Sequence, residues 1–182
     1  MLSSVEILIL SFIQGASEFL PISSIAHLVL VSKYYAFTNQ NLLIDICLHL
    51  GSLLAIITYF RKDLFSFIKN KNFLIKILIG TIPIVPMGYI FYQTGLIDEL
   101  RNLKVIGWMS LIFGILLYIS DKVSTKKKIE TEFTNKVAIF IGLFQVLALI
   151  PGVSRSGITI SSGRLMGFNR FDSAKISFFL SI

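Results

Sequence analysis

The sequence predicts an all-α polytopic integral membrane protein, and three observations support this fold class. The chain of 182 residues is 54% hydrophobic and 15% charged, with a mean hydropathy of +0.80. A soluble domain of this length needs far less apolar sequence. Several apolar runs approach or exceed the ~20 residues with which an α-helix crosses a bilayer. One run contains a cluster of polar side chains and a second cluster directly follows another run; such groups are costly at membrane depth and indicate function by default.

Six apolar runs follow one another along the chain, and we expect each to be helical. They cover residues 5–31, 42–60, 73–96, 105–120, 137–150 and the stretch after Arg164. Pro21 lacks an amide hydrogen and should break the first run. Pro83 and Pro86 should kink the third run in the same way.

The runs predict one membrane domain over residues 1–182. Within it we expect a first repeat over 1–120, a solvated cytoplasmic loop over 121–136 and an incomplete second repeat over 137–182. The sequence stops at Ile182 inside an apolar run. We therefore expect the C-terminal part of the natural protein to be missing.

The distribution of basic residues predicts the orientation in the membrane. Segments 61–72 and 121–136 are both rich in lysine, so the positive-inside rule places both in the cytoplasm. The second run then enters the cytoplasm from outside, which puts residues 32–41 outside. If the broken first run is a re-entrant hairpin, the N-terminus lies outside too. The formal net charge of +7 is explained by these loops. No RNA- or DNA-reading pattern accompanies it, so we expect no nucleic-acid partner.

The first polar cluster occupies residues 14–28. Its amide, carboxyl, hydroxyl and imidazole groups belong to Gln14, Ser17, Glu18, Ser23, Ser24 and His27. Residues 14 and 18 share one helical face. After the break at Pro21, a serine can cap a new helix that carries the histidine one turn further in. A broken helix at membrane depth is tolerated only where it is buried in protein or lines a water-filled cavity. A purely structural kink would not require a carboxyl group and an imidazole beside it.

The second polar cluster is the turn over residues 151–159. Gly152 and Gly157 permit close approach of the backbone to a ligand. Serine and threonine hydroxyls lie near a predicted helix start, where free backbone amides and the helix dipole favour binding of an anion. The planar guanidinium of Arg155 can donate to two phosphate oxygens at once. The alternative is a serine-capped loop whose arginine snorkels to the surface or pairs with Glu18. Both readings can hold if this ion pair forms until substrate arrives.

The two clusters also resemble each other. A glutamine, a proline and a hydroxyl-rich turn recur at Gln14, Pro21 and Ser23–Ser24 and again at Gln145, Pro151 and Ser154–Ser156. The chain enters the first copy from outside the membrane and the second copy from the cytoplasmic loop. This order predicts inverted repeats with two re-entrant hairpins that meet near the bilayer midplane. Together the clusters supply a nucleophile, an acid or base and charge stabilisation for phosphoryl transfer.

Both motifs resemble the signatures of the bacterial undecaprenyl-pyrophosphate phosphatases of the bacitracin-resistance type. The sequences are Gln-Gly-Ala-Ser-Glu-Phe-Leu-Pro-Ile-Ser-Ser-Ile-Ala-His over 14–27 and Pro-Gly-Val-Ser-Arg-Ser-Gly-Ile-Thr over 151–159. The similarity extends over essentially the whole chain, including residues 50–53. It implies an inner-membrane enzyme that hydrolyses undecaprenyl pyrophosphate to the monophosphate and recycles the carrier for peptidoglycan synthesis. It also implies a site that opens to the periplasm and a divalent cation, Mg or Ca.

The resemblance assigns roles to particular residues. The predicted catalytic residues are Glu18, Ser24, His27 and Arg155. The predicted substrate-binding residues are Gln14, Ser23, Ser154, Ser156, Gly157 and Thr159. Few carboxylates are available for a metal, and the metal ligands stay unknown with Glu18 as the candidate. This chain has Ile25-Ala26 where many members have Thr-Gly, which removes one hydroxyl.

Several alternatives stay open at this point. A phosphoserine, a phosphohistidine and direct attack by water all fit the spacing, and His27 or Glu18 can handle the proton. A transporter or flippase of the same anionic lipid would share the inverted repeat and the midplane anion site. The acid-phosphatase-like lipid phosphatases are disfavoured because no histidine follows Arg155. Asp45 and His49 either line the cavity or pack against the loops. A homo-oligomer is compatible with the sequence.

Overall fold

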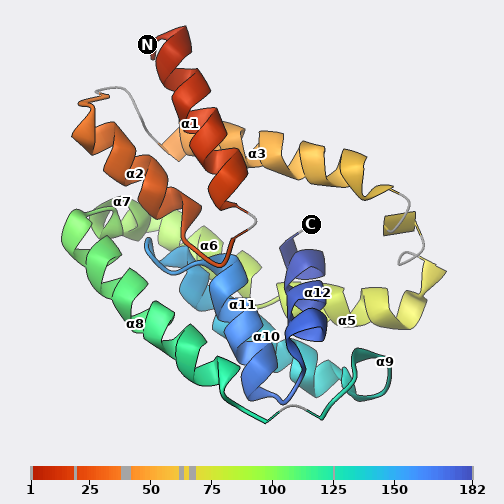
Figure 1. Ribbon diagram of the computed structural model, residues 1–182. Helices are drawn as coiled ribbons and strands as arrows, with labels where there is room; N and C mark the ends of the chain where they lie inside the picture. The colour runs from red at the N-terminus through yellow and green to blue at the C-terminus, as the bar shows by residue number, and fades with distance from the viewer. Residues whose placement is uncertain are drawn as a thin grey trace.

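The described part of the chain is built from helices, which confirms the predicted fold class (Figure 1). The computed structural model describes residues 2–18, 20–37, 42–61, 64–65, 69–124 and 126–181. Its one isolated β-bridge joins Lys127 and Phe168. Parts of the predicted outer segment 32–41 and of the basic segment 61–72 lie outside the described residues.

The helices follow the predicted apolar runs. In chain order they are α1 (Ser4–Ser17), α2 (Ser24–Tyr34), α3 (Leu42–Tyr59), α5 (Lys71–Thr81), α6 (Ile84–Gln93), α7 (Leu96–Leu100), α8 (Leu103–Asp121), α9 (Ile129–Glu132), α10 (Asn135–Val146), the 3-10 turn η1 (Leu147–Leu149), α11 (Arg155–Leu165) and α12 (Arg170–Ser181). Three described stretches are long and apolar enough to cross a membrane: Leu42–Tyr59, Lys71–Gln93 and Leu103–Asp121. The chain is thus a polytopic membrane protein.

The helix breaks occur where proline and serine predict them. α1 ends at Ser17 and α2 begins at Ser24, with Ser23 as the N-cap that accepts a hydrogen bond from the amide of Ala26. α5 likewise ends at Thr81, and α6 begins directly after Pro83. Proline is well tolerated at a helix start because its missing amide hydrogen would have no partner there.

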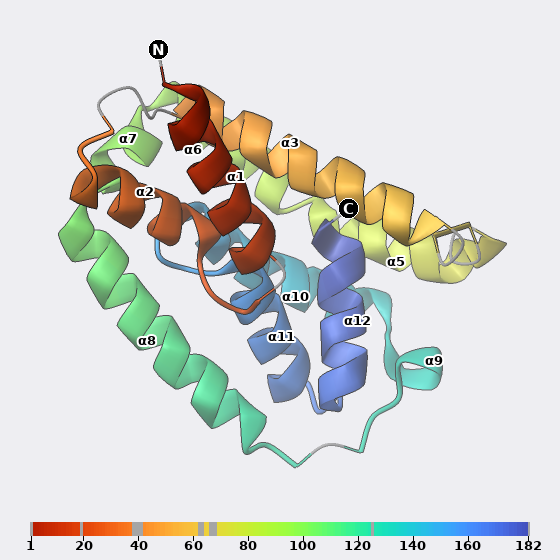
Figure 2. The ribbon, with the colours of Figure 1, turned by 45° about the horizontal axis from the view of Figure 1, so that its top comes forward.

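Two helical hairpins, α1–α2 and α10–α11, meet at their tips. Figures 1 and 2 show that α1–α2 comes from the end of the molecule where α7 lies, and α10–α11 from the end where α9 lies. The hydroxyl of Ser156 donates to the carbonyl of Leu20 at 2.9 Å. A Cβ at Gly157 would lie 3.3 Å from the carbonyl oxygen of Pro21, so a glycine suits this close approach. The repeat relation between the two halves stays a prediction.

The second hairpin is held in place by two close backbone contacts. α10 crosses α5 so tightly that a Cβ on Gly142 would lie 2.1 Å from the carbonyl oxygen of Gly80. The turn before α11 adopts a positive φ of 100° at Gly152, where a Cβ would meet the carbonyl oxygen of Ile106 in α8 at 2.6 Å. Ser110 in α8 donates to the carbonyl of Gly152 at 3.2 Å. These contacts fix the tip that carries the second motif.

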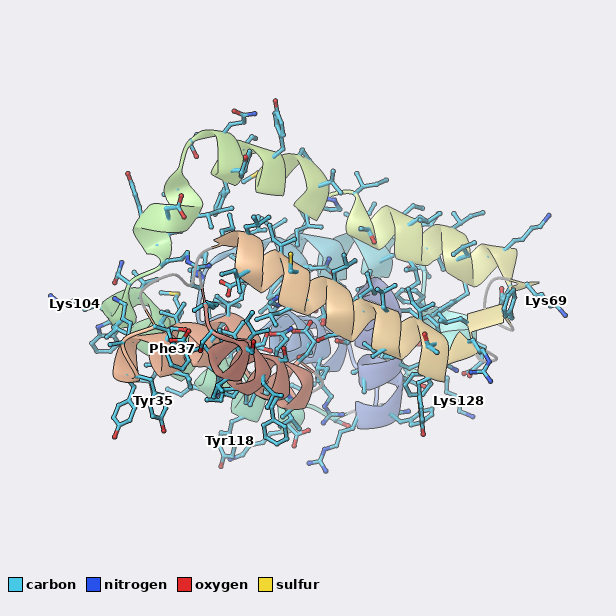
Figure 3. All side chains as sticks on the ribbon, turned by 90° about the horizontal axis from the view of Figure 1, so that it is seen from above. Tyr35, Phe37, Lys69, Lys104, Tyr118 and Lys128 are labelled. Carbon is cyan, nitrogen blue, oxygen red and sulfur yellow. The ribbon has the colours of Figure 1, made fainter. Side chains whose placement is uncertain are left out.

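Basic groups of the two lysine-rich segments lie at the same end of the molecule. Figure 3 shows Lys69 and Lys128 at one end and Lys104 at the other. This arrangement agrees with the expectation that segments 61–72 and 121–136 share one side of a membrane. Apolar side chains are exposed along the outer surfaces of α3, α6 and α8, as a lipid environment requires.

The prediction of a solvated loop over 121–136 is wrong for some of its residues. α9 lies within it, and Ile129 and Phe133 are buried in a core cluster with Phe168. The amide of Lys127 also donates to the carbonyl of Gly167 at 3.1 Å. The prediction rested on the many charged residues of the segment. Its few apolar residues pack against Phe168, just after the end of α11.

Candidate active site

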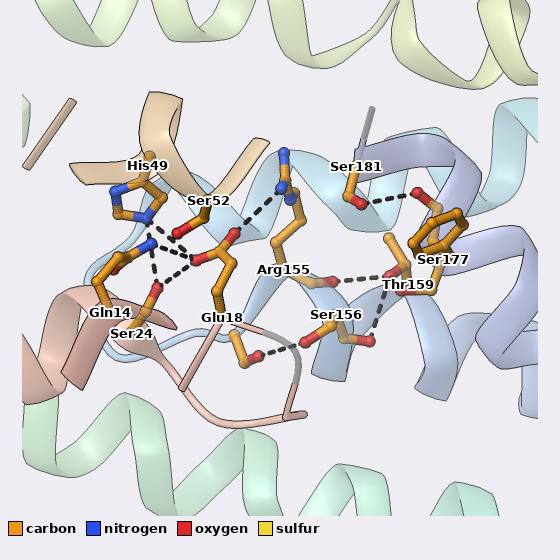
Figure 4. Close-up of polar contacts among 12 residues, drawn as sticks. Gln14, Glu18, Ser24, His49, Ser52, Arg155, Ser156, Thr159, Ser177 and Ser181 are labelled. Atoms are coloured by element: carbon orange, nitrogen blue, oxygen red, sulfur yellow. Dashed lines mark hydrogen bonds and ion pairs between the residues drawn. The ribbon is translucent and has the colours of Figure 1, made fainter. Parts of the chain in front are cut away.

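Glu18 is the centre of the polar cluster between the hairpin tips. It is the residue directly after α1, and its backbone amide still donates to the carbonyl of Gln14. The carboxylate oxygen Oε2 accepts from the side-chain amide of Gln14 at 2.9 Å and from the hydroxyl of Ser24 at 2.8 Å (Figure 4). The helix break at Pro21 turns α2 back so that Ser24, its first residue, faces the end of α1. The predicted shared face of residues 14 and 18 is therefore observed.

Arg155 brings the second motif to the same carboxylate. It is the first residue of α11, and its Nη2 lies 3.3 Å from Oε1 of Glu18. Its side chain is 40% exposed, whereas that of Glu18 is 15% exposed. The ion pair that the sequence offered as one alternative is present. Because the arginine is only half buried and contacts a single carboxylate oxygen here, it can exchange this partner for an anionic ligand.

His49 of α3 is the third element of the cluster, and sequence reasoning left its role open. Its Nε2 lies 3.3 Å from the hydroxyl oxygen of Ser24 and 3.3 Å from Oε2 of Glu18. Its Nδ1 lies 2.7 Å from the backbone carbonyl oxygen of Asp45. The i, i+4 spacing of Asp45 and His49 is visible in the sequence. The contact with Ser24 is long-range and follows only from the packing of α3 on α1.

His27, the histidine of the first motif, lies in a different environment. Its Nδ1 is 2.7 Å from the backbone carbonyl oxygen of Ser23. No contact joins it to Glu18 or Ser24 within the part of the chain that the structure describes. The catalytic role of His27 stays a prediction.

The second motif forms a capped helix start. Ser154 is the N-cap of α11 and accepts from the amide of Gly157 at 3.1 Å. Its hydroxyl is also 3.1 Å from that of Ser156, which donates to Leu20 in the first hairpin. The amides of the first turn and the guanidinium of Arg155 lie at this end of the helix. Free amides and the positive end of the helix dipole favour an anion at such a position.

Thr159 and Gln14 are buried behind this surface. The hydroxyl of Thr159 lies 2.7 Å from the carbonyl oxygen of Arg155 and 2.7 Å from the hydroxyl of Ser177 in α12. It therefore holds the backbone of Arg155. Gln14 is 1% exposed, and its amide positions Glu18. Ser23 is likewise buried as the cap of α2. As placed here, these residues support the groups that a substrate would contact.

Asp45 belongs to a separate ion pair. Its carboxylate is 2.6 Å from Nη2 of Arg101, in the joint between α7 and α8. Both side chains are buried or nearly so. Breaking a buried pair leaves an uncompensated charge, so the two residues hold the start of α3 against this joint. This anchor lies one helical turn before His49.

The protein groups provide few ligands for a metal. Within the described residues, no three His, Cys, Asp or Glu side chains are grouped closely enough to hold an ion. Mg²⁺ and Ca²⁺ take six or more oxygen ligands, and among the residues that the structure describes Glu18 is the only carboxylate that contacts the cluster's serine and arginine. These residues do not fit a metal cage made by the protein. A cation here would need most of its ligands from a bound phosphate compound.

The cluster unites the groups that phosphoryl transfer uses. A hydroxyl lies within hydrogen-bond distance of a carboxylate and an imidazole, and a guanidinium lies beside a helix N-terminus. The first set can generate a nucleophile and move a proton, and the second can stabilise negative charge on phosphate oxygens.

Comparisons with known proteins agree with this chemistry. The family described as "Bacitracin resistance protein BacA" matches residues 7–182. A protein of Pelagibacter ubique named "Undecaprenyl-diphosphatase" is 56% identical over 98% of this chain and 70% of its own length. Proteins of the same name from Campylobacter curvus and Dinoroseobacter shibae are 44% and 40% identical over 98% and 97% of this chain, and over 72% and 71% of their own lengths. The chain therefore belongs to the BacA family of bacitracin resistance proteins.

Proposed function

We propose that this chain hydrolyses undecaprenyl pyrophosphate to undecaprenyl phosphate and inorganic phosphate. The observation that carries the proposal is the meeting of Ser24, Glu18 and Arg155 between two hairpin tips, in a chain whose relatives bear the name undecaprenyl-diphosphatase. The apolar helices around the cluster suit an isoprenoid tail. Its hydrolysis would recycle the lipid carrier for cell-wall synthesis.

In the proposed mechanism, Arg155 changes partner when the substrate binds. The guanidinium leaves Glu18 and binds oxygens of the diphosphate, which also face the free amides at the start of α11. A planar fork and a helix N-terminus together stabilise the charge that spreads over the phosphoryl oxygens in the transition state. Ser154 and Ser156 hold the turn in the geometry that this contact needs.

We assign the attack on the terminal phosphorus to the hydroxyl of Ser24. It lies 2.8 Å from Glu18 and 3.3 Å from His49, so a proton acceptor is within reach when the P–O bond forms. A water molecule activated by the same groups is the alternative nucleophile. Trapping of phosphorylated Ser24 in a rapid-quench experiment distinguishes the two.

A divalent cation, Mg²⁺ or Ca²⁺, enters the proposal only as a companion of the substrate. Since the protein residues do not form a cage, we propose that the diphosphate supplies most of its ligands, with Glu18 as the nearest carboxylate. All residues of the proposed site come from one chain. The proposal therefore needs no second subunit and is equally compatible with a homo-oligomer.

We further propose that the protein resides in the bacterial inner membrane with the site open to the periplasm. The shared end of the two lysine-rich segments supports this orientation, since such segments remain in the cytoplasm. Cysteine substitution of Lys104 and Lys128, followed by labelling of intact cells with a membrane-impermeant reagent, tests it. Labelling is expected at 104 and not at 128, and the reverse result would invert the proposed topology.

The decisive experiment measures phosphate release from undecaprenyl pyrophosphate by the purified protein in detergent. It compares Mg²⁺, Ca²⁺ and chelator, and it includes Glu18→Ala, Ser24→Ala and Arg155→Ala. Ser11→Ala and Arg61→Ala are matched controls, because both residues make local contacts outside the cluster. Release that collapses in the three site variants and persists in the controls supports the proposal. Tight lipid binding without release in any metal would refute it in favour of transport.

A further inference from the structure

His49 is an ionisable residue that neither motif contains. It lies on α3, in the middle of one of the three candidate membrane spans, where an ionisable side chain needs a functional or structural reason. Its Nε2 is 3.3 Å from the hydroxyl of Ser24 and equally close to Oε2 of Glu18. Figure 4 shows the imidazole above both groups, opposite Arg155. The chemistry of these contacts assigns it a role.

The backbone fixes the tautomer of the ring. A carbonyl oxygen can only accept a hydrogen bond, so Nδ1, which lies 2.7 Å from the carbonyl oxygen of Asp45, must carry a proton. In the neutral ring, Nε2 then has a lone pair. That lone pair faces Ser24 and Glu18, and only the serine has a proton to share with it. The neutral ring is thus oriented as a proton acceptor toward Ser24.

Glu18 is less suited to accept this proton itself. In the observed arrangement the single proton of Ser24 is donated to Oε2 of Glu18, and rotation about the Cβ–Oγ bond presents it to Nε2 of His49. The carboxylate also accepts from Gln14 and balances the charge of Arg155. Protonation would remove that balancing charge. By contrast, a proton on Nε2 of His49 produces an imidazolium that lies within ion-pair distance of Glu18.

The anchor of α3 keeps the imidazole in this position. Asp45 and Arg101 form a buried ion pair one helical turn before His49, and Ser52, one turn after it, is also buried. His27 on α2 has the same Nδ1 contact with the carbonyl four residues before it. The structure gives it no contact with Ser24 among the described residues, so the same tautomer there faces no described nucleophile.

We propose that His49 is the catalytic base that takes the proton from Ser24. This assignment deepens the proposed function and rests on it. In the first half-reaction, Ser24 Oγ bonds to the terminal phosphorus, its proton moves to Nε2, and the bond to the bridging oxygen breaks with undecaprenyl phosphate as leaving group. In the second, water attacks the phosphoserine, the Oγ–P bond breaks, and both hydrogens of the water stay with the departing phosphate. The imidazolium returns its own proton to Oγ as inorganic phosphate leaves.

Chemical rescue tests this role directly. His49→Ala creates a space beside Ser24 that free imidazole can occupy, whereas His49→Gln fills much of it with a side chain that cannot act as a base. Loss of a general base costs about 10²- to 10⁴-fold in kcat, so both variants are expected to fall within that range. Added imidazole should restore phosphate release in His49→Ala and not in His49→Gln. Thermal unfolding in detergent shows whether each variant is folded.

His27→Ala is the comparison variant, because its vacated space does not adjoin Ser24. Its activity, whatever its level, should not rise with imidazole. Retention of kcat within about threefold in both His49 variants would overturn the proposal. So would a loss in His49→Ala that imidazole leaves unchanged while lipid binding weakens equally, because that pattern assigns the residue to positioning. Absence of release by the parent protein would instead refute the proposed function.

Discussion

The two ends of α11 each carry an arginine paired with a carboxylate, and their environments differ. Arg155, at the N-terminal end, is 40% exposed and meets Glu18 at 3.3 Å. Arg164, in the last turn, is 6% exposed. It donates to the backbone carbonyls of Phe168, Asp121 and Val123 at 3.2, 2.5 and 3.3 Å. Its Nε also lies 3.4 Å from the carboxylate of Asp121.

The difference separates a functional charge from a structural one. Backbone carbonyls cannot leave without unfolding their segments, so Arg164 permanently joins the end of α8 to the α11–α12 turn. Arg155 contacts one carboxylate on another hairpin, which a diphosphate can replace. Burial alone does not decide the role of a membrane arginine; the kind of acceptor it contacts is more informative. The predictions below test this distinction from the largest expected effect to the smallest.

Replacement of Arg155 should remove activity without removing the fold. Loss of a charge that stabilises the transition state costs about 10²- to 10³-fold in kcat, and we expect Arg155→Ala to lose at least that factor. Arg155→Lys should recover only part, since an ammonium cannot bind two oxygens in a plane. Phosphate release and thermal unfolding in detergent measure both quantities. A large drop in melting temperature for Arg155→Ala would mean that this arginine is structural as well.

Replacement of Arg164 should have the opposite pattern. Arg164→Met keeps much of the apolar volume but removes the donor that the guanidinium supplies to the carbonyls of Phe168, Asp121 and Val123. A buried acceptor left without a partner costs about 1 to 3 kcal/mol, so unfolding should occur at a markedly lower temperature. The turnover per folded molecule should stay near that of the parent. If activity fell while stability held, the proposed division between the two ends of α11 would be wrong.

The sequence predicted the site end of α11 better than the structural end. Pro21, Pro151 and the serines beside them mark helix breaks and caps through local chemistry, and the two motifs met as expected. In the sequence, Arg164 marks only the point where another apolar run begins. Its partners lie across a turn and on α8, and no spacing rule relates them. The i, i+4 relation of His49 to Asp45 is local, whereas the packing of α3 against α1 brings His49 to Ser24.

A third prediction uses the glycines near the two ends of α11. A Cβ at Gly157 would lie 3.0 Å from the Cβ of Ser154 and 3.3 Å from the carbonyl of Pro21, whereas at Gly163 it would lie 3.0 Å from the hydroxyl of Ser173. Gly157→Ala should therefore disturb the contact between the hairpin tips and lower kcat by roughly tenfold, since small misplacements at a site are costly. Gly163→Ala should affect packing against α12 and leave kcat unchanged.

Phosphate-release rates for the two alanine variants, normalised to folded protein, give the comparison. Equal effects on kcat would indicate that α11 moves as one rigid body and that its two ends cannot be treated separately. Unfolding temperatures complete the test. A helix-interior alanine is favoured over glycine by about 1 kcal/mol, so Gly163→Ala is expected to keep its stability if Ser173 can shift by a few tenths of an ångström.

The smallest effect is expected at Arg170, which shares Asp121 with Arg164. Its Nε donates to the carboxylate of Asp121 at 2.7 Å, but its side chain is 78% exposed. Exposed ion pairs are screened by salt and often contribute nothing measurable. Arg170→Ala should leave the melting temperature close to that of the parent, with any difference vanishing at high salt. A loss comparable to that of Arg164→Met would transfer the structural role from the backbone carbonyls to the carboxylate of Asp121. The distinction between Arg155 and Arg164 would then have to rest on burial rather than on the kind of acceptor.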